Sequence, residues 1–328
     1  MIMAAGVGSR LMPMTADRPK PMIPMANRPL MADIVQLLHR HGFNDIIANL
    51  HYHADAIANY FGAGEEWDVS LQFSREEELM GTAGGVKRCE WFLDESFVIV
   101  SGDALTDINL GALMRAHKQR GALATIALKA VEDVENFGVV VTDEAGLIRS
   151  FQEKPRAAEA LSRLVNTGIY VFEPEIFQYI PAGQFYDFGK QVFPHLVKIN
   201  APFYGAEVNG YWCDVGNIAT YRQAHADILQ GRVKVNMGGK LTNTDNGALI
   251  LAAPGVQFGT NVKFEGNVVI GAGSRIGSNV TISNSVIWND TIVGENSTLR
   301  DAVIGARCRI QAHSVIAPGA VIASGTLQ

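Results

Sequence analysis

Hydrophobic residues in the first two thirds of the chain follow two alternating patterns. Apolar residues at three- and four-residue spacing predict helices over 31–41 and 110–120, which end at Gly42 and Gly121, residues suited to a left-handed cap. Short apolar runs predict strands at 1–5, 45–50, 97–100, 124–128 and 169–172. Strands that alternate with helices form a mostly parallel sheet covered on both faces. The pattern therefore predicts an α/β fold whose ligands lie at the carboxyl ends of the strands.

The last third of the chain has a different pattern. After Gly231, isolated aliphatic residues recur between glycines and asparagines. Counting by six from Val256 to Ile322, ten of the twelve positions are Val or Ile, which predicts an unbroken six-residue period. Such a hexapeptide repeat indicates a parallel β-helix of about four coils, stabilised by roughly 1.5–3 kcal/mol per buried aliphatic side chain. We therefore divide the chain into residues 1–232 and a linker plus coil domain over 233–328.

Composition narrows the function classes. The 328 residues are 48% hydrophobic and 18% charged, which fits two globular domains. The net charge of -6, without a basic run, argues against a nucleic-acid partner. Three widely spaced cysteines without CxxC spacing argue against a zinc site and favour a reducing compartment. With no long apolar run and no room for a signal peptide before Gly6, we expect a cytoplasmic protein without a membrane partner.

Glycines and cations follow the first predicted strand directly. Gly6 and Gly8 let the backbone approach a ligand, and Arg10 and Lys20 supply positive charge for an anion. The third glycine of the dinucleotide fingerprint is absent, since Leu11 stands there, and the Walker pattern is absent as well. We interpret the segment as a cradle for a polyphosphate, in which the planar Arg and the compact Lys face different oxygens.

Two carboxylates stand where such a sheet places its ligands. Asp103 follows Gly102 directly after the strand at 97–100, and Asp214 precedes the predicted helix at 218–229. On pattern alone, each aspartate is also a plausible helix cap, so both readings stay open.

The segment GVGSRLMPMTADRPKPMIPMANRPL, residues 6–30, resembles the sugar-1-phosphate nucleotidyltransferases, whose signature is close to GxGxRLxPLTxxxPKPxxPxxNxPL. Ser9 replaces the usual Thr and Met14 the usual Leu, and neither change removes a charge. The resemblance implies a Rossmann-like, mostly parallel α/β catalytic domain followed by a left-handed parallel β-helix. It also implies an enzyme that joins an NTP and a sugar-1-phosphate into an NDP-sugar and pyrophosphate.

The resemblance also implies the nucleotide-binding residues. They are Ala5, Gly6, Gly8, Ser9, Arg10, Lys20, Gly81, Thr82, Gly84, Gly102 and Asp103. The segment ELMGTAGGV, residues 78–86, is expected to be a loop that lets a base approach the backbone; the alternative is a surface turn before a helix. It resembles the GTAGA of guanylyl and some uridylyl enzymes, which favours GTP.

For the sugar phosphate, the resemblance assigns the EKP motif that ends a predicted hairpin over 139–151. It implies that Lys154 holds the phosphate and that Glu153 accepts hydrogen bonds from sugar hydroxyls, with Gly138, Asn166, Thr167 and Asp214 completing the subsite. On pattern alone, Glu153 and Lys154 read as a solvated ion pair. Asp103 and Asp214 are the implied ligands of Mg²⁺, the expected cofactor. The catalytic group is then Arg10, Lys20, Asp103 and Lys154.

The sequence favours GTP and mannose-1-phosphate as substrates. A glucose-1-phosphate or amino-sugar-1-phosphate uridylyltransferase is the second choice. A catalytically silent regulatory subunit is the alternative from another class, and His313 in the repeat leaves an acyltransferase as a third. We expect copies of the chain to associate through the coil domain.

Overall fold

The computed structural model describes all residues, 1–328, and its contacts divide the chain into two compact units. The first consists of Met1–Gly6 and Ile34–Trp212, and the second of Val7–Asp33 and Cys213–Gln328. Each unit is therefore built from two separate stretches of chain. Segments 7–33 and 213–232, which the sequence analysis placed in the first domain, group with the C-terminal coils in this division.

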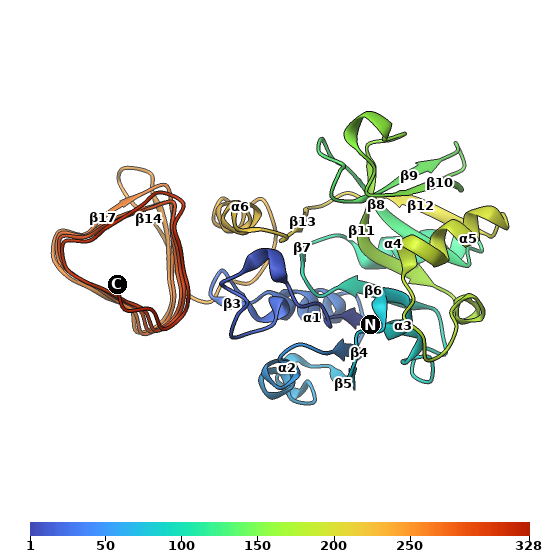
Figure 1. Ribbon diagram of the computed structural model, residues 1–328, viewed down its shortest axis with the longest axis horizontal. Coiled ribbons are helices and arrows are strands. Elements are labelled where there is room, and N and C mark those ends of the chain that lie inside the picture. The colour runs from blue at the N-terminus through green and yellow to red at the C-terminus, as the bar shows by residue number, and fades with distance from the viewer. The chain divides into compact units, whose positions relative to one another are not determined.

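The first unit contains a nine-stranded sheet, in the order β10-β9-β11-β6-β1-β4-β5, with β8 beside β11 and β12 beside β8 (Figure 1). The run β6-β1-β4-β5 is parallel, as predicted. Beyond β6 the sheet is mixed, because β11 runs antiparallel to β6, β8 and β9. Its nine strands are Ile2–Met3 (β1), Asp45–Leu50 (β4), Ser70–Arg75 (β5), Phe97–Ser101 (β6), Ala124–Ala130 (β8), Gly138–Thr142 (β9), Ile148–Glu153 (β10), Leu164–Phe172 (β11) and Phe203–Glu207 (β12). Two short strands lie outside this sheet, Ala104–Thr106 (β7) and Trp212–Asp214 (β13).

Helices accompany the strands. The two predicted helices are confirmed to within a residue at each end, as Leu30–Arg40 (α1) and Leu110–Gln119 (α4). The others are Ala54–Phe61 (α2), Gly81–Lys87 (α3), a π-helical turn at Phe188–Val192 and Phe193–Lys198 (α5). The expectation that 78–86 is a loop was wrong over most of its length, since α3 covers it from Gly81 onward. Rings of Tyr170, Phe172, Phe188 and Phe193 pack together in the core.

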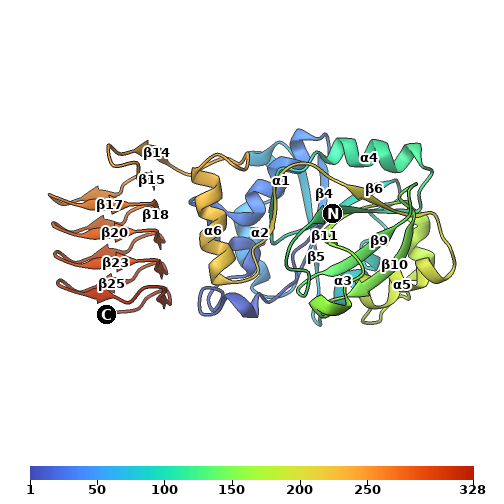
Figure 2. The same cartoon turned by 90° about the horizontal axis from the view of Figure 1, so that it is seen from above.

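The C-terminal part of the second unit consists of short strands in three sheets. Two sheets are wholly parallel, β16-β19-β22-β25 and β17-β20-β23-β26, and in the third β14 joins the parallel run β15-β18-β21-β24-β27. Viewed end on, the coils trace a triangle, and Figure 2 shows them stacked. This arrangement fits a parallel β-helix. Its strands are Lys240–Asn243 (β14), Leu249–Ala252 (β15), Gln257–Phe258 (β16), Lys263–Glu265 (β17), Asn267–Ile270 (β18), Arg275–Ile276 (β19), Thr281–Ser283 (β20), Val286–Ile287 (β21), Ile292–Val293 (β22), Thr298–Arg300 (β23), Val303–Ile304 (β24), Arg309–Ile310 (β25), Val315–Ile316 (β26) and Val321–Ile322 (β27).

The predicted unbroken period was wrong. At one corner, Asn261 donates to Asn279, 18 residues on, but Asn279 donates to Asn296, only 17 residues on. All three have left-handed backbones, with φ near 57°. Two successive coils are one residue short, because Val269 pairs with Val286 and Val286 with Val303. The interior positions therefore step from Ile270, Ile276 and Ile282 to Ile287, Val293 and Leu299, and the interior cluster does not include Val286, Ile292 and Thr298 of the predicted period.

A helix and a loop complete the second unit. The predicted helix at 218–229 is confirmed as Ile218–Leu229 (α6), which packs against β15 and β18. The segment 7–33 contains 3₁₀ turns at Ser9–Leu11 and Lys20–Met22 and a tight hairpin of Pro24–Met25 (β2) and Arg28–Pro29 (β3). No helix of either unit combines the length and apolarity needed to cross a membrane.

Candidate active site

The glycine-rich loop is fixed by Gly8. Its φ of 70° is left-handed, and a Cβ built there would lie 2.8 Å from the Cβ of Lys20. Thr15 donates through Oγ1 to the Gly8 carbonyl at 3.0 Å. Only glycine satisfies both the backbone conformation and the close approach. Gly8 therefore holds the turn at Ser9–Leu11, which carries Arg10, against Lys20.

Asp214 brings the two predicted cations together. Lys20 Nζ lies 3.2 Å from Oδ1 of Asp214, and Arg10 Nη2 lies 3.6 Å from Oδ2. The Lys20 side chain is only 7% exposed, whereas that of Arg10 is 58% exposed. Each carboxylate oxygen thus faces one cation, and the loop keeps one positive charge in excess. The helix-cap alternative for Asp214 was wrong, because Asn217 caps α6 through a reciprocal pair of bonds with Thr220.

Asp103 lies between β6 and β7, past the carboxyl end of β6. Ser101 donates through Oγ to Oδ1 of Asp103 at 2.5 Å. Gly102 donates its amide to the Met3 carbonyl at 2.8 Å, and a Cβ there would lie 2.8 Å from the same oxygen. A glycine is thus needed where β6 meets β1. The helix-cap alternative for Asp103 was also wrong, because Asn109 caps α4.

A buried polar pair that the sequence analysis missed supports the start of the glycine segment. Asn49 accepts from the Ala4 amide at 3.0 Å through Oδ1 and donates to Glu76 Oε1 at 2.7 Å. Glu76 also accepts from the Met80 amide at 3.0 Å, next to α3. Both side chains are almost fully buried. Only Asn49 left a signal in the sequence, as a polar residue near the end of the apolar strand at 45–50, because Glu76 follows the mostly polar strand SLQFSR. The predicted residues Ala5 and Gly6 follow directly, and no atom lies within 4 Å of a Cβ built on Gly6.

The predicted base-binding residues of α3 have structural partners. Cβ atoms built on Gly81 and Gly84 would lie 2.4 Å from the Tyr186 carbonyl and 2.6 Å from the Gln184 carbonyl. Thr82 donates through Oγ1 to Asp187 at 3.1 Å and accepts from the Phe188 amide. These glycines therefore allow α3 to pack on residues 184–186, which the loop interpretation did not foresee.

Glu153 is the last residue of β10, and Lys154 follows it directly. A Cβ on Gly189 would lie 2.5 Å from Glu153 Oε2, so the glycine makes room for this carboxylate. Burial raises the pKa of Glu153, while Lys154 opposes the shift. Lys154 has a left-handed φ of 47°, is 60% exposed, and holds its Nζ 3.9 Å from Glu153 Oε1. So long and open an ion pair contributes little stability, which leaves the lysine available to an anion.

The remaining residues predicted to bind the sugar already make contacts within the protein. Asn166 donates to the Tyr170 hydroxyl at 3.0 Å and accepts from the Gly168 amide. Thr167 is buried and donates to the Ala127 carbonyl at 2.8 Å, so its hydroxyl belongs to the sheet. A Cβ on Gly138 would lie 2.6 Å from the ring of Phe151. Packing alone therefore explains Gly138 and Thr167.

The protein offers no cluster of three or more His, Cys, Asp or Glu residues that could hold a metal ion. Mg²⁺ does not require such a cluster, because it is often held by one or two carboxylates together with waters and substrate phosphates. Asp103 and Asp214 supply oxygen donors of the right chemistry. Taken singly, each carboxylate suits a Mg²⁺ ion whose other ligands are substrate phosphates and water.

Comparison with known proteins gives two family matches. Residues 1–231 match the family described as nucleotidyl transferase, and residues 247–326 match the family described as GMPPB C-terminal domain. The chain is 39% identical over 327 residues to a UTP–glucose-1-phosphate uridylyltransferase of Synechocystis, covering 93% of this chain and 82% of the relative. It is 32% identical to a mannose-1-phosphate guanyltransferase of Debaryomyces hansenii, covering 94% and 86%.

A solved structure shares the fold. It is described as a glucose-1-phosphate thymidylyltransferase from Bacillus anthracis, crystallised with sucrose. Its TM-score is 0.65 at 26% identity, over 72% of this chain and 96% of that one.

Proposed function

Because the chain belongs to the nucleotidyl transferase family, we propose that it transfers a nucleotidyl group from an NTP to a sugar-1-phosphate, forming an NDP-sugar and pyrophosphate. The observation that carries the proposal is the glycine-fixed loop that holds Arg10 and Lys20 on the two oxygens of Asp214. This arrangement presents paired cations to a polyphosphate.

In the proposed reaction, an oxygen of the sugar phosphate attacks the α-phosphorus of the NTP. The bond from that phosphorus to the bridging oxygen of the β-phosphate breaks, and pyrophosphate leaves with the bonding electrons. The attacking phosphate is already an anion, so no side chain needs to remove a proton. Such chemistry depends on positioning and charge neutralisation more than on covalent help.

The residues then divide the work by charge. Arg10 and Lys20 stabilise the charge that builds on the departing pyrophosphate. Lys154, exposed at the end of β10, binds and orients the sugar phosphate, and Glu153 accepts hydrogen bonds from sugar hydroxyls. Asp103 and Asp214 would hold Mg²⁺, which when bound neutralises phosphate charge.

For the substrate pair we favour UTP with glucose-1-phosphate. The uridylyltransferase relative is 39% identical to this chain over nearly its whole length. Mannose-1-phosphate guanylyltransferases are 28–33% identical to this chain. GTP with mannose-1-phosphate, the pair favoured by the GTAGG sequence, remains the second candidate, and the match of residues 247–326 to the GMPPB C-terminal domain supports it.

For the C-terminal domain, we infer that the coils of residues 249–322 form a left-handed β-helix and that copies of the chain associate through it. Three sheets of stacked parallel strands support the β-helix, and the family resemblance implies its left hand. Sedimentation of the full chain tests the second inference, and a monomer over the whole concentration range would contradict it.

The experiment that tests the proposed function is a matrix of pyrophosphate release with Mg²⁺. It crosses ATP, GTP, CTP, UTP and dTTP with glucose-, mannose- and N-acetylglucosamine-1-phosphate. We expect UTP with glucose-1-phosphate to turn over at least about tenfold faster than other pairs, and a GTP–mannose maximum would select the second candidate. If every pair is inert while a nucleotide still binds, a silent regulatory subunit becomes the better description.

A further inference from the structure

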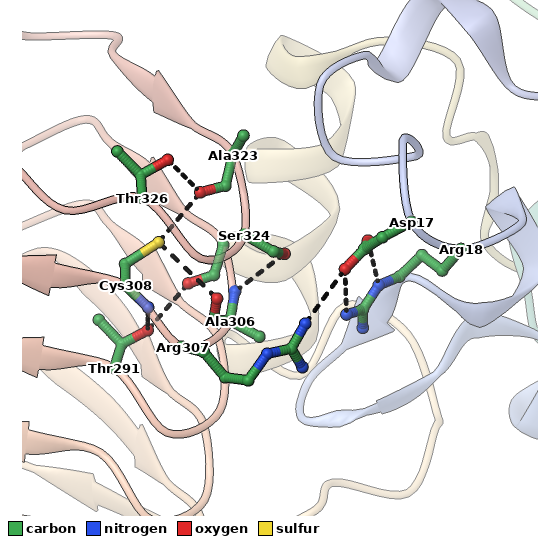
Figure 3. Close-up of polar contacts among 10 residues, drawn as sticks. Asp17, Arg18, Thr291, Ala306, Arg307, Cys308, Ala323, Ser324 and Thr326 are labelled. Atoms are coloured by element: carbon green, nitrogen blue, oxygen red, sulfur yellow. Dashed lines mark hydrogen bonds and ion pairs between the residues drawn. The ribbon is translucent and has the colours of Figure 1, made fainter.

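The loop that carries Arg10 and Lys20 rests on one edge of the coil stack. Asn27 donates to the Ile270 carbonyl at 3.1 Å, the guanidinium of Arg18 lies 4.6 Å from the ring centre of Trp288, and Arg307 lies 3.5 Å from Asp17. Ile270, Trp288 and Arg307 belong to successive coils, because β18 pairs with β21 and β21 with β24. Figure 3 shows Asp17 between Arg307 and Arg18. The loop is thus attached at three levels of the stack.

Trp288 is the central attachment. Although it belongs to a coil, it is only 1% exposed. Its indole Nε1 donates to the Tyr221 hydroxyl of α6 at 2.9 Å, and that hydroxyl donates to the Pro24 carbonyl of the loop at 2.5 Å. One side chain therefore joins a coil, a helix and the loop.

The elements that Trp288 joins also carry the candidate catalytic groups. Arg18 stands two residues before Lys20, which begins its own 3₁₀ turn. Asp214 stands shortly before α6, whose Tyr221 bonds Trp288. Both sides of the Lys20–Asp214 ion pair are therefore attached to Trp288 through short stretches of chain.

We propose that the coil domain positions the nucleotide-binding loop, with Arg18 and Trp288 as the positioning residues and Arg307 in a minor part. The inference rests on the proposed function, because it assumes that the loop binds a nucleotide. The ranking follows from burial: Trp288 is enclosed, whereas the Arg307 side chain is 63% exposed and its ion pair is screened by water. The coils then act on the reaction without contacting a substrate.

The test compares three arginine variants by calorimetric binding of Mg·UTP and Mg·GTP and by steady-state kinetics. Arg18→Ala should weaken nucleotide binding by about five- to tenfold, the scale of one partly buried cation–π contact. Its KM for the sugar-1-phosphate should change less than about twofold. Arg18→Lys should recover much of the affinity, and Arg307→Ala should lose about twofold at most.

Arg309→Ala is the matched control, because Arg309 is an exposed arginine in β25, on another side of the coil. It should bind nucleotide as the wild type does. Trp288→Phe keeps a ring under Arg18 but removes the N–H donor. Its nucleotide affinity should lie between those of the wild type and Arg18→Ala.

Hydrogen exchange gives a readout that does not depend on activity. In Arg18→Ala, amides of residues 9–25 should exchange faster than in wild type, while those of β4 and β6 should not. If Arg18→Ala melts at a lower temperature but keeps its nucleotide affinity and its exchange rates in residues 9–25, the positioning role is overturned and the proposed function is not. A wild-type chain that binds no nucleotide would overturn the proposed function, and the exchange result would still decide whether the coils hold the loop.

Discussion

Asp214 binds one cation with each of its oxygens, and this sharing explains how a buried lysine is tolerated. Lys20 is almost fully enclosed, and an unpaired ammonium there would be costly to bury. The carboxylate offsets that cost for Lys20 and also orients Arg10. Since two cations share one anion, the loop retains a net positive charge for a phosphate chain. Asp214 therefore has a structural task whether or not it also binds Mg²⁺.

Replacing Asp103 by Asn tests its proposed role as a Mg²⁺ ligand. An amide oxygen can still accept the Ser101 hydrogen bond, so the variant should unfold at the wild-type temperature. Loss of the charge should lower turnover at ordinary Mg²⁺ by about 100-fold or more. Pyrophosphate release checks this, with Asp94→Asn as a control at an exposed carboxylate. A fully active Asp103→Asn enzyme would remove Asp103 from the proposed metal site.

His225 should make the second unit sensitive to acid. It is 2% exposed, its Nδ1 faces the Ala26 amide at 3.4 Å, and its Nε2 is buried without a partner. Burial lowers the pKa of His225 from 6.5 to about 3. Below pH 6.5 the unfolded chain therefore binds a proton that the folded chain excludes, so stability is complete above pH 6.5 and falls as the pH drops toward 3.

Between pH 6.5 and pH 5, this one histidine should cost about 2 kcal/mol of the free energy of unfolding. Denaturant unfolding followed by tryptophan fluorescence measures it at each pH. In His225→Gln the free energy of unfolding should not show this decrease between pH 6.5 and pH 5. In His313→Gln, at an exposed coil corner, the decrease should remain. Equal slopes in wild type and His225→Gln would show that this site does not control the acid response.

At the scale of elements, α3 is a helix made possible by close packing. Three of its seven residues are glycine, a composition that usually weakens a helix. The Tyr186 carbonyl accepts from the amides of Ala83 and Gly84, both at 3.0 Å, which fixes the first turn from outside. The local sequence predicted a loop, because that stabilising partner lies about a hundred residues away.

Gly→Ala substitutions should have opposite effects in two helices. Alanine stabilises a helix interior by about 0.5–1 kcal/mol relative to glycine. Gly111→Ala, at the second residue of α4, should stabilise by up to about 0.5 kcal/mol, because the nearest neighbours of its Cβ lie at 3.5 Å. Gly84→Ala should instead destabilise by about 1–3 kcal/mol, because its Cβ would lie 2.6 Å from the Gln184 carbonyl. Thermal unfolding of both variants measures the effects. A more stable Gly84→Ala variant would mean that the backbone of residues 184–186 moves aside at little cost.

At the scale of the whole molecule, the hydrophobic patterns of the sequence predicted the features that neighbouring residues determine. The helix at 218–229 was predicted to the residue from its sequence pattern, although its cap is Asn217 and not Asp214. The strand and repeat patterns likewise predicted the parallel run and the coils. The mixed half of the first sheet was missed, because strand direction depends on how distant segments pair.

The candidate site was predictable only in part. The residues of the signature motif could be placed on a loop, and the structure brings Arg10, Lys20 and Asp214 together. The hydrogen bond of Thr167 to Ala127 and the stack of Arg18 on Trp288 could not be foreseen, because neither leaves a periodic trace. The shift within the repeat was missed because Val286 and Ile287 are both aliphatic.

His313 shows the same limit at a coil corner. It has a left-handed φ of 63° and is exposed, one coil beyond the stacked asparagines Asn261, Asn279 and Asn296. The backbone conformation explains the corner position, and nothing in its surroundings suggests a general base. The acyltransferase alternative thus gains no support from the structure.

The chain order of the second unit has a consequence for its biosynthesis. Asp17 and Arg307 are separated by 290 residues, so the loop leaves the ribosome long before the coil that receives it exists. At about 5–20 residues per second, that delay is roughly 15–60 s. During this time the segment that carries the cations has no scaffold. The nascent chain should therefore bind nucleotide about five- to tenfold more weakly until the coil that carries Trp288 has formed, and a chain that ends before Trp288 should stay at that weaker affinity.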